Sequence, residues 1–218
     1  MINGNRTKSG RKRSPRDFYI TPKGLPTEAI IRFLVDERLS ERERIVALDP
    51  GCGNGVWGEE LKNFAYYDDG KAYLPIIHGV DLEVKIVKQL NFPFFEPAYT
   101  SWWQEDFLEF DRKGYNLIIG NPPYSLAEKF VRHSFELLKS DGYVYFLFRL
   151  SFLEGIKRKN NLFTEYPIKR VYVCSRRPSF YTTEKGKHTT DTLAYAMFLW
   201  QKGYAGKTEL SYFDWNYK

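Results

Sequence analysis

Short apolar runs alternate with segments of helical periodicity along most of the chain. Four runs have the five- or six-residue length of buried strands, at residues 45–49, 76–81, 115–119 and 143–148. Apolar residues three and four positions apart predict helices at about 26–39, 56–64, 83–90 and 126–139. Because strands that alternate with helices are typical of a parallel sheet, the pattern predicts an α/β fold.

Weaker elements complete the pattern. A weak strand is expected at 98–101, a short helix after Ser151, and further strands at 168–173, 193–200 and 209–213. The last two strands are joined by K-G-Y-A-G, which predicts a closing hairpin.

The composition favours one soluble domain. With 218 residues, of which 43% are hydrophobic, the chain can bury a core of its own. It has no apolar run of about 18 residues, and its basic amino terminus lacks the apolar centre of a signal peptide, so an intracellular protein is expected. Cys52 and Cys174 are too few for a disulfide framework or a zinc site.

The net charge of +6 is distributed unevenly. Residues 1–16 contain six basic residues and no acid, and they are expected to form a disordered arm. Residues 156–190 carry a net charge of +7, whereas residues 17–155 carry −7. Two basic blocks around an acidic middle indicate contact with a polyanion, although a solvated basic tail explains the arm alone equally well.

Glycines and acids follow the predicted strands. D-P-G-C-G-N-G at 49–55 permits a tight turn and a close approach of backbone to ligand, but it is neither G-x-G-x-x-G nor a phosphate loop. Asp49, Asp81 and Asp106 lie at the ends of three successive strands. There Asp81 could bind a ribose diol, and Asp106 could bind an adenine amino group while Phe107 packs on the ring. A helix cap or a turn explains each aspartate singly as well.

The run at 115–119 ends in G-N-P-P-Y-S. Two adjacent prolines cannot donate ladder hydrogen bonds, so they stop the strand and stiffen the loop. Such a loop would hold the Asn121 amide and the Pro122 carbonyl oxygen as acceptors beside the ring of Tyr124. This arrangement suits a flat ligand with an amino group. The alternative for Tyr124 is a core aromatic residue.

These motifs together resemble the S-adenosylmethionine-dependent amino-methyltransferases, particularly the DNA adenine methyltransferases: D-P-G-C-G-N-G, D-L-E at 81–83, E-D-F at 105–107 and N-P-P-Y. D-F-Y-I-T-P at 17–22 is similar to the segment that these enzymes place before the cofactor loop. R-R-P-S-F at 176–180, with the tail after it, resembles small adenine methyltransferases of phages and prophages. The resemblance covers most of residues 17–213. It implies a Rossmann-like class I methyltransferase fold, with a mostly parallel seven-stranded sheet and a C-terminal antiparallel hairpin.

The resemblance also implies S-adenosylmethionine as the cofactor and DNA as the partner. Asn121, Pro122 and Tyr124 would be catalytic, with Tyr124 and Phe180 stacking on a flipped-out or unpaired adenine. The residues implied in cofactor binding are Tyr19, Thr21, Pro22, Asp49, Gly51, Gly53, Asp81, Leu82, Asp106, Phe107 and Asn121. The candidates for contact with DNA phosphates are Lys157, Arg158, Lys159, Arg170, Arg176 and Arg177.

The span before the closing strands is short for this family, at about 45 residues. The segment 156–190 is therefore expected to be a reduced recognition insert in a single catalytic domain at 17–218, or specificity is relaxed or comes from another chain. The setting implied is a restriction-modification system in the cytoplasm of a bacterium or of a phage-infected cell.

Two other functions stay open. N-P-P-Y enzymes also modify RNA bases or a protein glutamine, since a glutamine amide presents the same flat amino group. A catalytically silent DNA-binding subunit of a modification complex is the other possibility, and the intact Asn121, Pro122 and Tyr124 argue against it.

Overall fold

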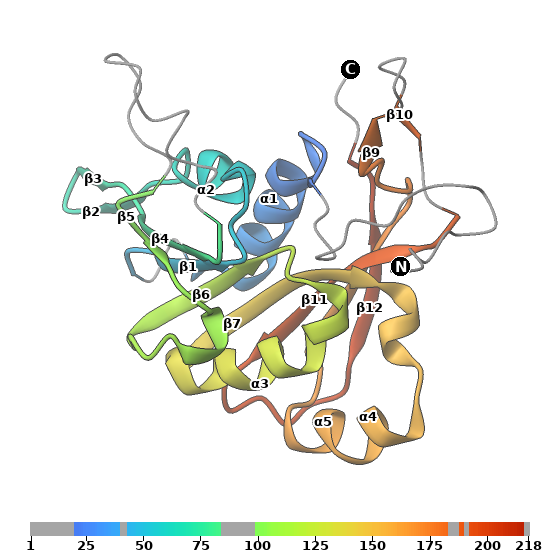
Figure 1. Ribbon diagram of the computed structural model, residues 1–218. Coiled ribbons are helices and arrows are strands. Elements are labelled where there is room, and N and C mark those ends of the chain that lie inside the picture. Colours follow the sequence, from blue (N-terminus) through green and yellow to red (C-terminus); the bar gives the residue numbers. More distant parts are fainter. Residues whose placement is uncertain (1–19, 40–42, 84–98, 183–187, 190–191, 216–218) are drawn as a thin grey trace.

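The computed structural model describes residues 20–39, 43–83, 99–182, 188–189 and 192–215, which form a mixed sheet between two layers of helices (Figure 1). The sheet has eight strands in the order β12-β8-β11-β7-β6-β1-β4-β5. Its strands are β1 (Val46–Pro50), β4 (Ile76–Asp81), β5 (Ser101–Gln104), β6 (Tyr115–Gly120), β7 (Leu138–Arg149), β8 (Arg170–Cys174), β11 (Tyr195–Gln201) and β12 (Glu209–Phe213).

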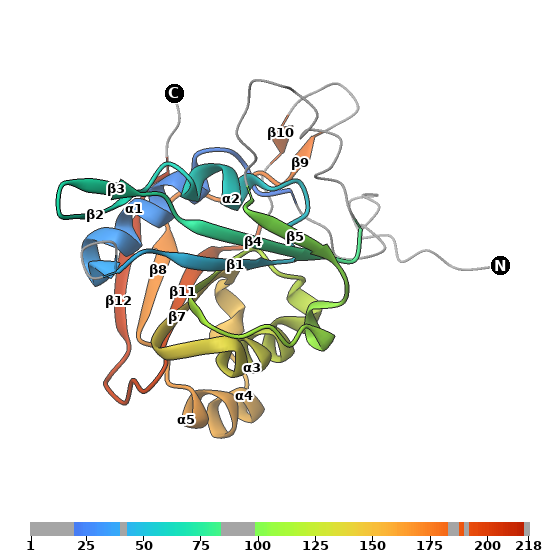
Figure 2. The same cartoon turned by 90° about the vertical axis from the view of Figure 1, so that its left-hand side faces the viewer.

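Helices cover both faces of the sheet (Figures 1 and 2). One face carries α1 (Leu25–Glu37) and α2 (Val56–Leu61). The other carries α3 (Ala127–Leu137), α4 (Ile156–Asn160) and α5 (Leu162–Glu165), with the 3₁₀ turns η3 (Phe107–Glu109), η4 (Tyr124–Leu126) and η5 (Leu150–Leu153). Two small hairpins lie outside the sheet, β2 (Tyr66–Asp68) with β3 (Lys71–Tyr73) and β9 (Tyr181–Thr182) with β10 (His188–Thr189).

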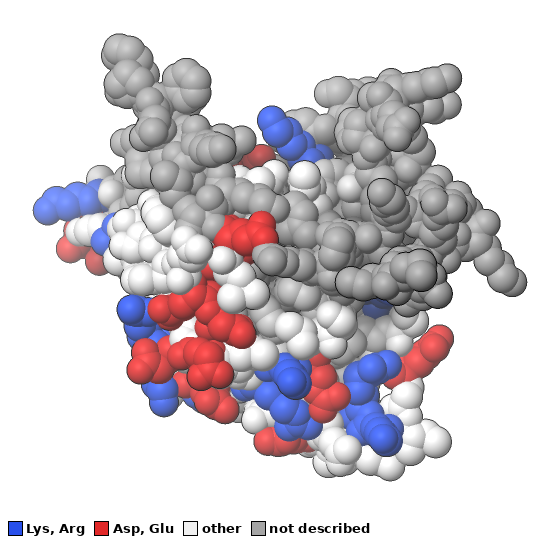
Figure 3. Space-filling view, in the orientation of Figure 1, with Lys and Arg blue, Asp and Glu red and all other residues white. Residues whose placement is uncertain are grey.

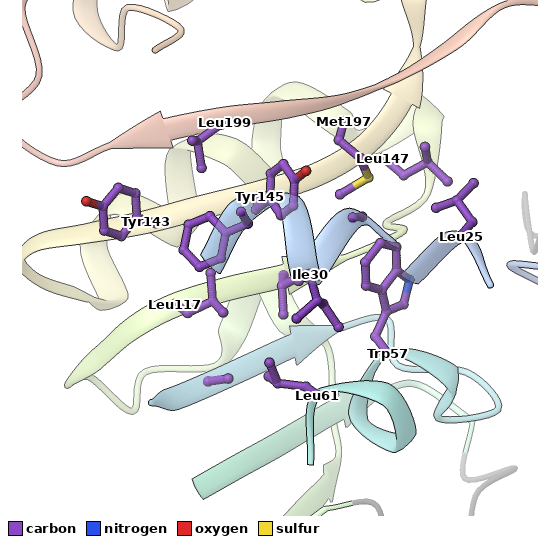
Figure 4. Packing of buried hydrophobic residues seen from close by; sticks show 14 of the residues in the cluster. Leu25, Ile30, Trp57, Leu61, Leu117, Tyr143, Tyr145, Leu147, Met197 and Leu199 are labelled. Carbon is purple, nitrogen blue, oxygen red and sulfur yellow. The ribbon is translucent and has the colours of Figure 1, made fainter. Parts of the chain in front are cut away.

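The strand β7 shows why the apolar runs are unbroken. Its alternate residues from Tyr143 to Leu147 pack in the cluster under α1 and α2, and those from Val144 to Phe148 pack in the cluster under α3. Figure 4 shows Tyr143 and Tyr145 facing the same cluster as Ile30 of α1. A strand buried on both faces has no polar face to alternate with.

The predicted parallel α/β sheet is confirmed, because β5, β4, β1, β6 and β7 pair in parallel. The strand count of seven and the closing hairpin are wrong. β11 pairs antiparallel with both β7 and β8, and β12 pairs in parallel with β8. Since both edges of β11 are taken, β12 cannot pair with it and instead joins the sheet at the outer edge of β8.

Element bounds differ from the predictions at a few places. The helix expected to reach residue 139 ends at Leu137, and β7 starts at once and passes through Asp141 at a φ of 60°. The strand expected at 98–101 forms at Ser101–Gln104. The β2–β3 hairpin was not predicted, although Asp69-Gly70 is a turn signal for one. The helix expected at 83–90 and the basic arm lie outside the described residues.

A buried ion-pair network joins α1 to the β8 edge of the sheet. The side chain of Glu37 is 2% exposed and pairs with Lys169 and with Arg170. Arg170 also pairs with Asp36 at 3.0 Å and with Glu209 of β12 at 2.8 Å. The network therefore fixes the helix that precedes the glycine loop against the far side of the sheet. Among the described residues, no helix is long and apolar enough to cross a bilayer.

Candidate functional site

The carboxyl ends of β4, β1 and β6 are neighbours in the sheet, and each is followed by a loop with candidate site residues. The glycine loop 51–55 follows β1, and the N-P-P-Y loop follows β6. A Cβ atom at Gly51 would lie 3.6 Å from Cδ of Pro123, so the two loops are within van der Waals contact of each other. The order of the strands thus brings together two motifs about 70 residues apart in the sequence.

The glycine loop requires its glycines. Gly51 and Gly53 have φ angles of 73° and 53°, a region that side-chain-bearing residues rarely adopt. The amide of Gly51 donates to the carbonyl of Val80 at 2.8 Å, which turns the loop back over β4.

Asp49 is the buried carboxylate of the site. Its side chain is 1% exposed, and Oδ2 accepts a hydrogen bond of 2.6 Å from the hydroxyl of Tyr99. Its other oxygen, Oδ1, has no hydrogen-bond partner among the described residues. Burial raises the pKa of Asp49 to about 7, the Tyr99 hydrogen bond opposes the rise, and the charge of Asp81 adds to it.

Asp81 ties the glycine loop to the end of β4. Oδ2 accepts from the amide of Gly53 at 2.8 Å, and Oδ1 accepts from the amide of Glu83 at 2.9 Å. A carboxylate accepts hydrogen bonds only, which is the chemistry that a ribose diol requires. Leu82, next to it, is 60% exposed.

Thr21 meets the N-P-P-Y loop. Its side chain is 4% exposed, and its hydroxyl accepts a 3.1 Å hydrogen bond from Nδ2 of Asn121, a hundred residues further along the chain. This bond fixes the rotation of the Asn121 amide. Pro22 follows Thr21 directly, and Tyr19 lies outside the described residues.

Aromatic rings gather beside this loop. Tyr124 is half-buried, and its ring centroid lies 5.9 Å from that of Tyr195 at the start of β11. Phe180 meets the same Tyr195 edge-on at 5.0 Å. The structure thus brings Tyr124 and Phe180 against a common neighbour. The guanidinium of Arg149, at the end of β7, lies 5.2 Å from the Tyr124 centroid.

Arg149, Tyr195 and Tyr99 were missed from the sequence. Arg149 gives a weak signal, as a charge that ends a long apolar run. Tyr195 gives none, because it reads as the first apolar residue of a strand. Tyr99 belongs to a stretch without clear periodicity.

Phe107 and Asp106 make contacts within the protein that differ from those predicted for an adenine pocket. Phe107 is 3% exposed and packs against Phe130, with ring centroids 4.6 Å apart, and against His133 at 4.9 Å. It is a core residue between η3 and α3. Asp106 is exposed and caps η3, since its Oδ1 accepts from the amide of Leu108 at 2.9 Å. The cap, which was the alternative explanation for this aspartate, is what the structure contains.

The predicted phosphate contacts divide into two groups. Arg170 is wrong as a phosphate contact, because it is 15% exposed and belongs to the ion-pair network of α1. Arg158 donates from Nε to the carbonyl of Phe152 at 2.9 Å and so caps η5. Arg176 pairs with Asp214 at 2.7 Å.

Three of the predicted contacts are exposed and form no ion pair among the described residues: Lys157, Lys159 and Arg177. On the face shown in Figure 3, basic and acidic side chains are interspersed over α3, α4 and α5. His188 lies in β10, where side chains are not described.

His78 and Cys52 have structural roles. His78 accepts or donates at Nδ1 toward the hydroxyl of Tyr115 at 2.9 Å, and burial lowers its pKa. Cys52 is 5% exposed, and burial raises the pKa of its thiol far above the usual range.

Solved structures of methyltransferases share this fold, and one of them contains bound S-adenosylmethionine. A methyltransferase subunit of a type I restriction-modification system from Streptococcus thermophilus matches with a TM-score of 0.62 and 14% identity, over 90% of this chain and 47% of that one. Magnesium protoporphyrin IX methyltransferase from Synechocystis, with bound S-adenosylmethionine, matches with a TM-score of 0.56 and 13% identity, over 81% and 78%. An N-methyltransferase from Bradyrhizobium japonicum matches with a TM-score of 0.52 and 13% identity, over 81% and 93%.

These likenesses identify a class of fold. The chain has the Rossmann-like fold of the class I S-adenosylmethionine-dependent methyltransferases. It spans about half of the length of the restriction-modification subunit. No protein-family model and no curated protein matches the sequence.

Proposed function

We propose that this chain transfers a methyl group from S-adenosylmethionine to the exocyclic amino group of adenine in DNA. The observation that carries the proposal is the N-P-P-Y loop, whose Asn121 amide is held by Thr21 beside the glycine loop. This places an amide and a stiff carbonyl-bearing turn next to the part of the fold where class I methyltransferases bind their cofactor.

The residues around the glycine loop fit the cofactor. The left-handed turns at Gly51 and Gly53 let a ligand approach the backbone, and Asp81 places a carboxylate, the acceptor that a ribose diol needs, at the end of β4. Asp49 has a buried oxygen without a partner among the described residues, which suits a cationic group. When bound, S-adenosylmethionine would supply an electrophilic methyl group.

The loop residues act by orientation and by stabilisation of charge. An adenine amino group is a poor nucleophile, because its lone pair is delocalised into the ring. If the Asn121 side-chain oxygen and the Pro122 carbonyl oxygen accept its two hydrogens, the nitrogen moves toward tetrahedral geometry with its lone pair directed at the methyl group. No strong base is needed before the attack, since the proton can leave afterwards.

The aromatic cluster suits a base taken out of the helical stack. Stacking contributes about 1–3 kcal/mol per base, which offsets part of the cost of unpairing. Tyr124 would support one side of the base, with Tyr195 fixing its ring, whereas Phe180 is 8% exposed and packs edge-on against Tyr195 in the core, so it has little surface for the other side.

DNA is the favoured carrier of the adenine for two reasons. The side chains of Lys157 and Lys159 on α4 and of Arg177, three residues before Phe180, are exposed, and basic residues recur in the sequence at 1–16. One of the similar folds is a subunit of a type I restriction-modification system. In such a setting, another chain could supply the sequence specificity that a short recognition insert does not.

The test is to incubate the purified chain with labelled S-adenosylmethionine and, in turn, with DNA, RNA and protein, and to identify the methylated product after digestion. We expect N6-methyladenine in DNA. Asn121→Ala abolishes the product, whereas the matched variant Asn63→Ala, at an exposed site just after the carboxyl end of α2, retains it. Methylglutamine, a methylated RNA base or no product from any substrate would each refute the proposal.

A further inference from the structure

Tyr99 reaches Asp49 through a slot that glycines leave open. It lies just before β5 and is 2% exposed. A Cβ atom at Gly58 of α2 would lie 2.6 Å from Cζ of the Tyr99 ring, closer than side chains tolerate, and one at Gly79 of β4 would lie 3.1 Å from Cδ1. The ring is therefore enclosed by two elements, and its position is defined.

The slot delivers the Tyr99 hydroxyl to one side of the Asp49 carboxylate. The hydroxyl donates to Oδ2 at 2.6 Å. On the other side, a Cβ atom at Gly120 would lie 2.6 Å from Oδ1. Gly120 directly precedes Asn121, so Asp49 is held between the tyrosine and the loop that we propose to be catalytic.

Asp49 lacks a positive partner among the described residues. The titratable groups that act on it are Tyr99, Asp81 and the thiol of Cys52. Tyr99 is itself protonated, because burial raises its pKa well above the usual value. A buried carboxylate with one hydrogen bond and an acidic neighbour is stabilised in its charged form chiefly by a cation that arrives from outside.

We propose that Tyr99 is a positioning residue that holds Asp49 for the positively charged amino group of S-adenosylmethionine, and that binding of this cofactor thereby depends on pH. The inference rests on the proposed cofactor, and it adds a residue, a partner group and a coupled proton to the site. In the empty protein, burial raises the pKa of Asp49 to about 7, so the protonated form of this carboxyl is favoured to a much higher pH than usual.

The sign of the pH dependence follows from the charge of the ligand. A cationic group favours the ionised carboxylate, so binding near pH 7 releases a proton. Affinity therefore rises as the pH increases through the pKa of Asp49, up to the pH at which the amino group of the ligand begins to lose its own proton. Without the hydroxyl of Tyr99, which opposes the rise in that pKa, the increase in affinity moves to higher pH.

The experiment is isothermal titration calorimetry with S-adenosylhomocysteine, which carries the same amino group. It is run from about pH 6 to about pH 9 in two buffers of different ionisation enthalpy, across the pKa of about 7. We expect the wild type to release a fraction of a proton per site on binding near pH 7, and a smaller fraction as the pH rises. Tyr99→Phe, which keeps the ring in its slot, binds roughly ten-fold more weakly there and recovers toward higher pH.

Tyr115→Phe is the matched control, since it also removes one buried hydroxyl, which bonds to His78 away from the glycine loop. It retains the wild-type pH profile. Gly79→Ala crowds the Tyr99 ring without removing its hydroxyl, and it shifts the profile in the same direction as Tyr99→Phe. This second variant keeps the test decisive if Tyr99→Phe does not fold.

The outcomes separate this inference from the proposed function. A folded wild type that binds no S-adenosylhomocysteine refutes the proposed cofactor itself. A wild type that binds without releasing a proton, or a Tyr99→Phe or Gly79→Ala variant with an unchanged profile, overturns the role of Tyr99 alone.

Discussion

Thr21→Val tests whether the contact between Thr21 and Asn121 orients the proposed catalytic amide. Valine keeps the shape of threonine and removes the oxygen that accepts from Nδ2 of Asn121 at 3.1 Å. Without that acceptor the amide can rotate, and a rotated amide presents hydrogens instead of an oxygen to an amine. We therefore expect Thr21→Val to lower the rate of the chemical step and to leave the binding of DNA nearly unchanged.

The magnitude follows from the worth of one neutral hydrogen bond. A net contribution of about 0.5–1.5 kcal/mol corresponds to a roughly two- to ten-fold lower kcat. Because Thr21 is 4% exposed, Asn121 gains no water in exchange, and the effect should lie toward the upper end. The KM for DNA should change little.

The assay is single-turnover transfer of labelled methyl groups to DNA at saturating cofactor, with thermal unfolding as a check of the fold. Thr208→Val is the control, since it also removes a hydroxyl, one that donates to the carbonyl of Ile168 at 2.8 Å at the opposite end of the sheet. A single-turnover rate of Thr21→Val equal to that of the wild type would show that Thr21 does not orient the amide. A loss confined to KM would show the same.

Three further changes have expected outcomes. Glu37→Gln leaves Lys169 without its carboxylate and removes one of the three carboxylates that pair with Arg170, which lowers the free energy of unfolding by about 3–5 kcal/mol in urea, whereas Glu209→Gln, 62% exposed, costs about 1 kcal/mol or less. Arg149→Gln removes the cation from the N-P-P-Y tyrosine ring and raises the KM for DNA roughly three-fold, whereas Arg112→Gln, whose cation lies 4.6 Å from a different ring, does not. Asp49→Asn removes a carboxylate whose pKa rises from 3.8 to about 7 on folding. In the wild type the unfolded chain ionises at a lower pH than the folded protein, so the free energy of unfolding decreases as the pH rises from about 4 to about 7. Asp49→Asn lacks this pH-dependent decrease, and thermal unfolding of both proteins at pH 5 and at pH 8 measures it. An equal pH dependence of the two proteins would contradict the raised pKa of Asp49.

The local signals in the sequence predicted the part of the fold that depends on local structure. An apolar run such as 76–81 has no polar alternation, because parallel strands are covered on both faces, and it formed β4 with the predicted bounds. The glycine loop was likewise recognisable, since Gly51 and Gly53 adopt backbone angles that few other residues accept. Such features are readable because the residue type and its cause lie within one short segment.

The far edge of the sheet was not predictable in the same way. A seven-residue connection that contains K-G-Y-A-G suits a hairpin, yet β12 joins β8 and not β11. The choice depends on which edges are already taken, and this information is spread over β7, β8 and β11. The same limit applies to Arg170, which looks like a surface cation in a basic block and is instead paired with acids of α1.

Phe107 shows how a motif can be present while its expected role is filled by packing. E-D-F follows β5 where a cofactor contact was predicted, but Phe130 of α3 takes one side of the Phe107 ring. A phenylalanine that is 3% exposed stabilises η3 against α3, and it has little surface left for a ligand. Sequence alone cannot distinguish the two, because both need an aromatic residue after a strand.

The contacts that define the candidate site join residues far apart in the chain. Asn121 is fixed by Thr21 a hundred positions away, and Asp49 by Tyr99 at a distance of fifty. The segment that contains Thr21 was recognisable by its resemblance to a known motif, whereas no motif contains Tyr99. The position of Tyr99 is instead marked by two glycines, because Gly58 in α2 and Gly79 in β4 leave room for its ring. Glycines in regular elements without left-handed angles are therefore a signal in their own right, because they mark where another side chain must pass to reach a buried charge.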